Sequence, residues 1–175
     1  MLHRSRRDFD ALASRLASEG IGALALDLRG HGDSQGSIGT DFAPMVADVR
    51  LRAASSSVAA TSAARSDCSG ASLGANLVAL AAADDPGVAS LALLSPSLDY
   101  RGLRIETAMR KSAPPRAHGS ERRRSARLPF GARPRKGTRG REILSLTGAG
   151  HGSTMLERES SLMGSLVDWF RRTLL

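Results

Sequence analysis

The sequence predicts an α/β protein with a mostly parallel sheet and helices on both faces. Three apolar runs predict it: 21–28 and 88–94, each directly after a predicted helix, and 141–146, ahead of a terminal amphipathic helix. Near-continuous apolar runs of this length are typical of parallel strands, which are buried on both faces. Helices that alternate with such strands indicate βαβ units.

Two helices are predicted in the first third of the chain. Four apolar residues within 7–19 recur at the spacing of one helix face, and Gly20 ends this helix. The four are Phe9, Leu12, Ala13 and Leu16. A second helix covers 41–51, with Asp41 as its cap and Pro44 in its first turn, where proline is tolerated.

Two further helices frame the second half of the chain. Small helix-forming residues over 73–82 predict one, followed by a turn at 84–87. The other covers 157–174 and carries one apolar stripe. The stripe consists of Leu162, Leu166, Val167, Phe170 and Leu174.

Two segments interrupt this pattern, and we expect both to be irregular or disordered. Residues 52–69 contain one valine and no Ile, Leu, Phe or Tyr, so their composition does not predict a buried strand. Residues 112–139 are rich in Arg, Pro and Gly without periodicity. Such abrupt changes in composition are what an out-of-frame reading of a GC-rich gene would give. We therefore hypothesise that both segments are foreign to the fold.

The net charge of +8 is concentrated in one region. Residues 101–141 contain 14 Lys and Arg against two acids, whereas the remainder contains 11 basic and 15 acidic residues. A mildly acidic protein thus carries one basic segment. That segment could bind phosphates, but it has almost no aromatic residues for stacking on bases, so a nucleic-acid partner is the weaker expectation.

The 175 residues fit a single domain, 1–175. No leading apolar stretch predicts a signal peptide or a membrane anchor. The single cysteine, Cys68, excludes an internal disulfide framework and fits a cytoplasmic location. Cys68 itself is not expected to be a nucleophile. Since no Cys/His cluster has metal-ligand spacing, we expect neither metal nor cofactor.

A G-x-S-x-G motif at residues 70–74 is the strongest candidate site. In this pattern a serine, here Ser72, lies on a sharp strand-to-helix turn. Gly70 and Gly74 are both expected where a Cβ would clash with the turn. The backbone N–H of Leu73 would lie at a helix N-terminus, suited to an oxyanion.

A second motif, D-x-R-G-H-G-x-S, covers residues 27–34. With the later G-x-S-x-G, it resembles the α/β-hydrolase superfamily, and most closely its small bacterial esterase, lipase and serine-aminopeptidase-like members. The resemblance covers residues 5–51, 70–111 and 141–175. It implies the α/β-hydrolase fold with N-terminal strands missing, and it makes His31 a structural residue of its loop.

The resemblance also implies a triad in the order Ser, Asp or Glu, His. His151, in Gly-Ala-Gly-His-Gly between the last strand and the last helix, matches the base, and Ser72 the nucleophile. The implied reaction is hydrolysis of a small-molecule acyl substrate through an acyl-enzyme on Ser72, without a cofactor. Oligomeric state and substrate are left open.

The remaining parts of the implied machinery are open. The acid is expected within 112–139, where Glu121 is the one carboxylate, and Asp99 is the alternative. The second oxyanion N–H would come from an early loop, near Leu2 or His3. Two competing hypotheses remain: a catalytically inactive homologue, and a nucleic-acid-binding module that uses residues 101–141.

Overall fold

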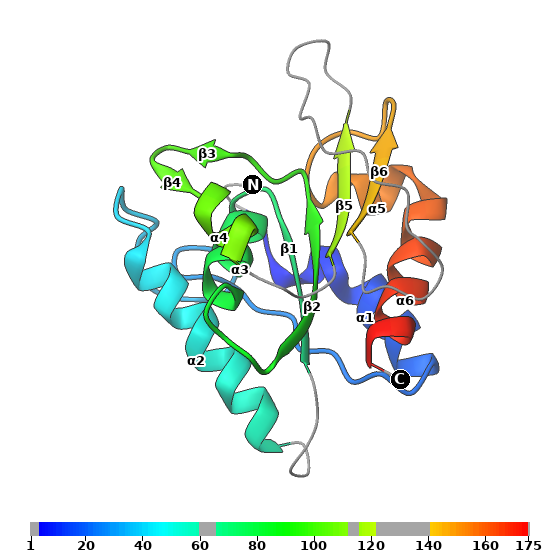
Figure 1. Cartoon of the computed structure of the whole chain (residues 1–175), viewed down its shortest axis with the longest axis horizontal. Coiled ribbons are helices and arrows are strands. Elements are labelled where there is room, and N and C mark those ends of the chain that lie inside the picture. Colours follow the sequence, from blue (N-terminus) through cyan, green and yellow to red (C-terminus); the bar gives the residue numbers. More distant parts are fainter. Residues whose placement is uncertain (1–3, 60–65, 112–115, 122–140, 175) are drawn as a thin grey trace.

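The computed structural model describes residues 4–59, 66–111, 116–121 and 141–174. Within these ranges, four strands form a parallel sheet in the order β1-β2-β5-β6 (Figure 1). The strands are β1 (Ser66–Ala71), β2 (Val88–Leu94), β5 (Arg116–Glu121) and β6 (Arg141–Leu146). A short antiparallel hairpin of β3 (Asp99–Tyr100) and β4 (Leu103–Arg104) follows β2. The predicted parallel sheet is confirmed.

Helices cover both faces of this sheet (Figure 1). On one face lie η1 (Arg6–Phe9), α1 (Asp10–Ser18) and α6 (Ser160–Leu174), and on the other α2 (Ala43–Ala59), α3 (Leu73–Ala82) and α4 (Glu106–Lys111). The short α5 (Thr154–Arg158) precedes α6. Each helical layer packs a separate apolar core against the sheet. Within the described ranges, no helix combines the length and apolarity that crossing a bilayer requires.

Helical periodicity predicted the layer of α1 and α6 well. Leu12 and Leu16 are buried on α1, and Gly20 follows with a positive φ of 77°, a conformation that glycine adopts without strain. The predicted terminal helix is divided in two, because Glu159 between α5 and α6 is extended, with φ −126° and ψ 93°. Leu162, Leu166, Val167, Trp169 and Phe170 form the buried stripe of α6.

The prediction of a buried strand at 21–28 is wrong. These residues are not in a strand, and Leu24 is 63% exposed although Ile21 is buried. No strand within the described part of the chain lies beside the segment. Apolar composition alone does not make a strand, because the backbone groups also need a partner.

The expectation that 52–69 and 112–139 are irregular is also wrong where the chain is described. Helix α2 continues through Ala59, β1 begins at Ser66, and β5 covers Arg116–Glu121. All six residues of β1 pair with β2, and all six of β5 pair with β6. Pairing with neighbouring strands thus overrides a weak intrinsic strand preference. Residues 60–65, 112–115 and 122–139 of the two segments lie outside the described residues.

Candidate active site

Ser72 lies on a sharp turn between β1 and α3, as the motif predicted. Its backbone has φ 53° and ψ −116°, which is strained for a residue with a side chain. The strain is held in place because the Ser72 N–H donates a hydrogen bond of 2.8 Å to the Leu94 carbonyl at the end of β2. Ser72 is 6% exposed. This is the geometry of a nucleophile elbow.

The two motif glycines do not serve the same purpose. A Cβ on Gly70 would lie 2.3 Å from the Gly74 carbonyl oxygen, so only glycine fits where β1 passes under the start of α3. A Cβ on Gly74 would meet nothing within 4 Å. The expectation of a clash is therefore correct for Gly70 and wrong for Gly74, the second residue of α3, where an added Cβ would face open space.

The fold brings His151 to Ser72 across 79 residues of sequence. The His151 Nε2 atom lies 2.9 Å from the Ser72 Oγ atom, which is hydrogen-bond distance. His151 comes from the loop between β6 and α5 and is exposed, so its imidazole forms the open side of the pair. A serine hydroxyl within reach of an imidazole is the arrangement that an activated nucleophile needs.

Three polar contacts hold the His151 loop. The His151 N–H donates to Thr154 Oγ1 over 3.0 Å, and the Thr154 hydroxyl donates back to the His151 carbonyl over 2.8 Å. The Gly152 N–H donates to the Ser95 hydroxyl over 3.0 Å. Ser95 follows β2 directly and is buried. Residue spacing gives no signal for Ser95, so sequence reasoning missed it.

Hydrogen bonds to the loop after β2 also hold the start of α3 in place. Leu73 is the first residue of α3, so its backbone N–H is one of those with no carbonyl partner inside the helix. Three residues further along α3 lies Asn76, which is fully buried. Its side chain donates to the Ser97 and Leu103 carbonyls and accepts from the Ser97 N–H, at 2.8–3.2 Å. Asn76 therefore fastens α3 to the loop after β2, a role that sequence reasoning also missed.

The two candidate acids are placed very differently. The Asp99 carboxylate is used inside its own hairpin, where it pairs with Arg104 at 2.9 Å and accepts from the Gly102 N–H at 2.6 Å. The Arg104 hydrogen bond lowers the pKa of Asp99 below its usual value. Glu121 is the last residue of β5 and pairs in register with Leu146, the last residue of β6. Its backbone thus ends at the sheet edge from which the His151 loop departs.

The loop after residue 28 is held by a buried carboxylate, Asp27. It accepts hydrogen bonds from the Arg6 backbone N–H (2.6 Å), the Arg6 guanidinium and the Asp33 N–H (3.0 Å). Burial alone would raise the pKa of Asp27, but these donors outweigh it and lower the pKa. His31 is buried in this loop, with Nδ1 3.1 Å from the Arg29 carbonyl oxygen. That placement fits the structural role expected for His31.

Other candidate groups contribute little to the site. Burial raises the pKa of the Cys68 thiol to about 11, with the Asp67 and Asp85 charges adding to the rise, so the thiol stays protonated at neutral pH. Within the described ranges, no three His, Cys, Asp or Glu side chains are grouped to hold a metal. In the basic segment, Arg104 and Arg110 pair with acids, and residues 122–140 lie outside the described residues, as do Leu2 and His3.

Comparison with known proteins identifies the family. The family model described as serine aminopeptidase, S33, matches residues 2–128, well over half of the chain. The chain belongs to this serine aminopeptidase (S33) family. No curated protein sequence matches it.

Solved structures show that this family member has the α/β-hydrolase fold. An esterase from Pyrococcus furiosus matches with a TM-score of 0.70 at 15% identity, over 98% of this chain and 80% of that one. A hydrolase from Thermoplasma acidophilum, described as CIB-like, matches with a TM-score of 0.65 at 19% identity, over 98% of this chain and 84% of that one. An α-β serine hydrolase homologue from Coxiella burnetii matches with a TM-score of 0.63 at 18% identity, over 91% of this chain and 76% of that one. The predicted fold class is confirmed.

Proposed function

We propose that this chain is a serine hydrolase that cleaves carboxylic esters or related acyl compounds through an acyl-enzyme on Ser72. The single observation that carries the proposal is the 2.9 Å contact between His151 Nε2 and Ser72 Oγ at a strained strand-to-helix turn. The family match to serine aminopeptidases and the fold shared with an esterase support the same reaction class.

The proposed reaction has two halves. Ser72 Oγ attacks the substrate carbonyl carbon while His151 Nε2 takes the hydroxyl proton. The Leu73 N–H donates to the oxyanion that forms, and its place at the N-terminus of α3 favours negative charge. The intermediate then expels the alcohol or amine, which receives the proton from His151. Water attacks the acyl-enzyme with His151 again as base, and the carboxylic acid leaves as Ser72 regains its proton.

We further propose Glu121 as the acid that orients His151, in preference to Asp99. The backbone of Glu121 ends β5 beside the strand that leads into the His151 loop. The Asp99 carboxylate already accepts hydrogen bonds from Arg104 and Gly102. An acid in this role holds the imidazole in the correct tautomer and stabilises the imidazolium ion.

Covalent labelling with a fluorophosphonate probe tests the proposal. The folded protein is expected to gain one adduct on Ser72, found by peptide mass spectrometry, and Ser72→Ala is expected to gain none. Hydrolysis of p-nitrophenyl acetate should fall in the same variant by several orders of magnitude. Folded protein that neither labels nor hydrolyses would be the inactive homologue instead. Its circular dichroism spectrum and cooperative unfolding would establish that it was folded.

We also propose a location: the lone cysteine is consistent with a hydrolase that works in the reducing cytoplasm. Cys68 is free in the structure. Fractionation of cells that make the tagged protein tests this, and recovery in a secreted fraction would contradict it.

A further inference from the structure

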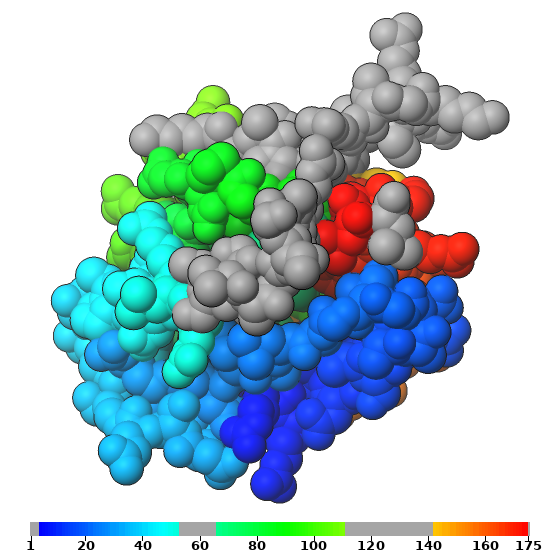
Figure 2. All heavy atoms as spheres, turned by 90° about the horizontal axis from the view of Figure 1, so that it is seen from below, coloured from blue at the N-terminus to red at the C-terminus, as the bar shows by residue number. Residues whose placement is uncertain are grey.

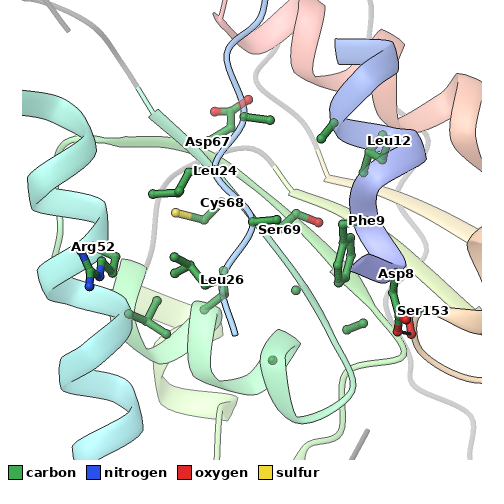
Figure 3. Close-up of a pocket in the computed structure, with 18 of the residues that line it drawn as sticks. Asp8, Phe9, Leu12, Leu24, Leu26, Arg52, Asp67, Cys68, Ser69 and Ser153 are labelled. Atoms are coloured by element: carbon green, nitrogen blue, oxygen red, sulfur yellow. Dashed lines mark hydrogen bonds between the residues drawn. The ribbon is translucent and has the colours of Figure 1, made fainter. Parts of the chain in front are cut away.

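A carboxylate from the N-terminal part of the chain contacts the loop that carries His151. The Ser153 hydroxyl donates a hydrogen bond of 2.6 Å to Asp8 Oδ2, across 145 residues of sequence. Ser153 lies two residues after His151 and is 2% exposed, and Asp8 belongs to η1. Both residues line the pocket drawn in Figure 3, where their side chains lie against each other. The base of the proposed catalytic pair therefore lies two residues from a contact that the triad pattern does not assign.

The Ser153 hydroxyl is not used as a helix cap. Ser153 directly precedes α5, a position where a serine side chain usually accepts a hydrogen bond from a backbone N–H of the first turn. Here the side chain forms no cap bond, and the Ser153 backbone is already helical, with φ −66° and ψ −22°. A capping serine instead has an extended backbone. The hydroxyl therefore serves the contact with Asp8 rather than the start of α5.

Arg4 holds the Asp8 carboxylate in place. The Arg4 Nε atom donates to the same Asp8 oxygen over 2.6 Å, and it lies 3.4 Å from the Ser153 hydroxyl oxygen. The guanidinium also donates to Glu157 of α5 over 2.8 Å. Hydrogen bonds between ionised groups are roughly twice as strong as neutral ones. Since the Asp8 side chain is 15% exposed, solvent screens its pair with Arg4 less than it screens a fully exposed ion pair.

The segment that carries Asp8 is itself fastened to a loop of the fold. Arg6 donates to Asp27 through both its backbone N–H and its guanidinium, and the guanidinium also donates to Asp33 over 2.9 Å. The Asp27 side chain is 3% exposed. None of the four residues of η1 is buried, and the blue N-terminal part lies at the surface in Figure 2. Polar contacts therefore locate Asp8, and a substitution there leaves both apolar cores unchanged.

Two anchors from different elements thus meet at adjacent residues of the His151 loop. Gly152 is held by Ser95 after β2, and Ser153 is held by Asp8 in η1. A single hydrogen bond leaves a loop free to turn about it, whereas a second one from another element fixes the orientation of the loop. Orientation matters because a small misplacement of a catalytic group can cost a large factor in rate.

We propose that Asp8 is a positioning residue for His151, which it orients through Ser153 while Arg4 holds the Asp8 carboxylate. This role depends on the proposed function, in which His151 is the base. Asp8 acts through the loop and not on the substrate. Loss of its carboxylate should therefore lower kcat and leave KM nearly unchanged, whereas a general loss of folded protein would lower the apparent rate in proportion to the unfolded fraction.

Alanine substitution of Asp8 tests this role in the full chain. We expect Asp8→Ala to lower kcat for p-nitrophenyl acetate about tenfold and to leave KM within about twofold. Asp10→Ala is the matched control, because it removes an exposed carboxylate two residues further along, and it should leave both constants within about twofold. Asp8→Asn keeps an acceptor oxygen for Ser153 and should recover most of kcat. Urea unfolding establishes that each variant is folded under the assay conditions.

A double variant separates positioning from a general loss of stability. Since both side chains act through one hydrogen bond, we expect Ser153→Ala to lower kcat about as much as Asp8→Ala does. The double variant should lose no more than either single variant. Ser153→Ala compared with Asp10→Ala also carries the test if Asp8→Ala fails to fold. Losses that multiply in the double variant would overturn the proposal.

The parent chain distinguishes this failure from failure of the proposed function. If the parent labels with the fluorophosphonate probe and hydrolyses the ester, but Asp8→Ala has the kcat of Asp10→Ala, the positioning role alone is overturned. A folded parent that neither labels nor hydrolyses overturns both proposals. In the supporting case, Asp8→Ala still gains the adduct on Ser72, about tenfold more slowly than Asp10→Ala does.

Discussion

The Gly152 N–H donates a hydrogen bond of 3.0 Å to the Ser95 hydroxyl, and so fastens the loop that carries His151 to the end of β2. The same strand end accepts the hydrogen bond from the Ser72 N–H through Leu94. Two adjacent residues after β2 and at its end therefore locate both members of the proposed catalytic pair. The distance between Ser72 and His151 is set by one rigid strand rather than by two independent loops.

Ser95→Ala should therefore impair catalysis more than binding. Removal of the hydroxyl leaves the Gly152 N–H buried and unpaired, at a cost of about 1–3 kcal/mol. We expect kcat for p-nitrophenyl acetate to fall about tenfold while KM changes little, because the substitution displaces the base and not the substrate site. Ser97→Ala is the matched control, since the Ser97 hydroxyl donates to an exposed carbonyl, that of Asp99. Equal kinetics for both variants would contradict a positioning role for Ser95.

The two motif glycines should respond oppositely to alanine. Gly70→Ala places a methyl group 2.3 Å from the Gly74 carbonyl oxygen, so we expect a loss of about 1–3 kcal/mol in the free energy of unfolding. Gly74→Ala adds a methyl in open space within a helix and should stabilise by up to about 1 kcal/mol. Urea unfolding of both variants measures this. A Gly70→Ala protein as stable as the parent would refute the close approach of β1 and α3.

The parts of this fold that follow from local pattern were predictable from the sequence. Helices α1, α3 and α6 repeat apolar residues at helical spacing, and β2 is a continuous apolar run. The pairing of Ser72 with His151 could also be anticipated, because both lie in glycine-flanked motifs whose order matches the superfamily.

The predictions that were wrong, and the site residues that were missed, concern positions whose structure depends on partners distant in sequence. Residues 21–28 have the composition of a buried strand but have no described strand to pair with. Ser66–Ala71 lacks that composition, yet all of it pairs with β2. Ser95 positions the site through one hydrogen bond to a backbone N–H, and Asn76 through three hydrogen bonds to backbone groups. A lone serine or asparagine has no spacing signature, so neither could be found before the fold was known.

Neutralising each candidate acid separately distinguishes Glu121 from Asp99. Glu121→Gln should lower kcat by up to about four orders of magnitude if Glu121 orients His151. Asp99→Asn should leave kcat within about twofold, because that carboxylate serves its own hairpin. Burst-phase labelling of Ser72 and steady-state kcat, measured on both variants, show which carboxylate the reaction needs. A larger loss in Asp99→Asn would transfer the role to Asp99.

Asp67 should make the protein less stable as the pH rises. It is half-buried on β1, and burial raises the pKa of its carboxyl above the usual 3.8 although Thr173 and Ser90 donate toward it. A chain of donors ends on the carboxylate: Trp169 Nε1 to Ser90 (3.1 Å), Ser90 to Thr173 (3.0 Å), and Thr173 to Asp67. The folded state thus holds the proton more tightly than the unfolded state.

The sign of the effect follows from this proton balance. Between pH 3.8 and the raised pKa of Asp67, the folded protein binds more protons than the unfolded chain, so the Asp67 contribution to stability falls as the pH rises. Asp67→Asn, which keeps an acceptor oxygen for Thr173, should be more stable than the parent at pH 7, with the difference vanishing below pH 3.8. Unfolding free energies measured across this range test it, with the exposed Asp168→Asn as control. If Asp168→Asn reproduced the pH-dependent gain, burial of Asp67 would not be its cause.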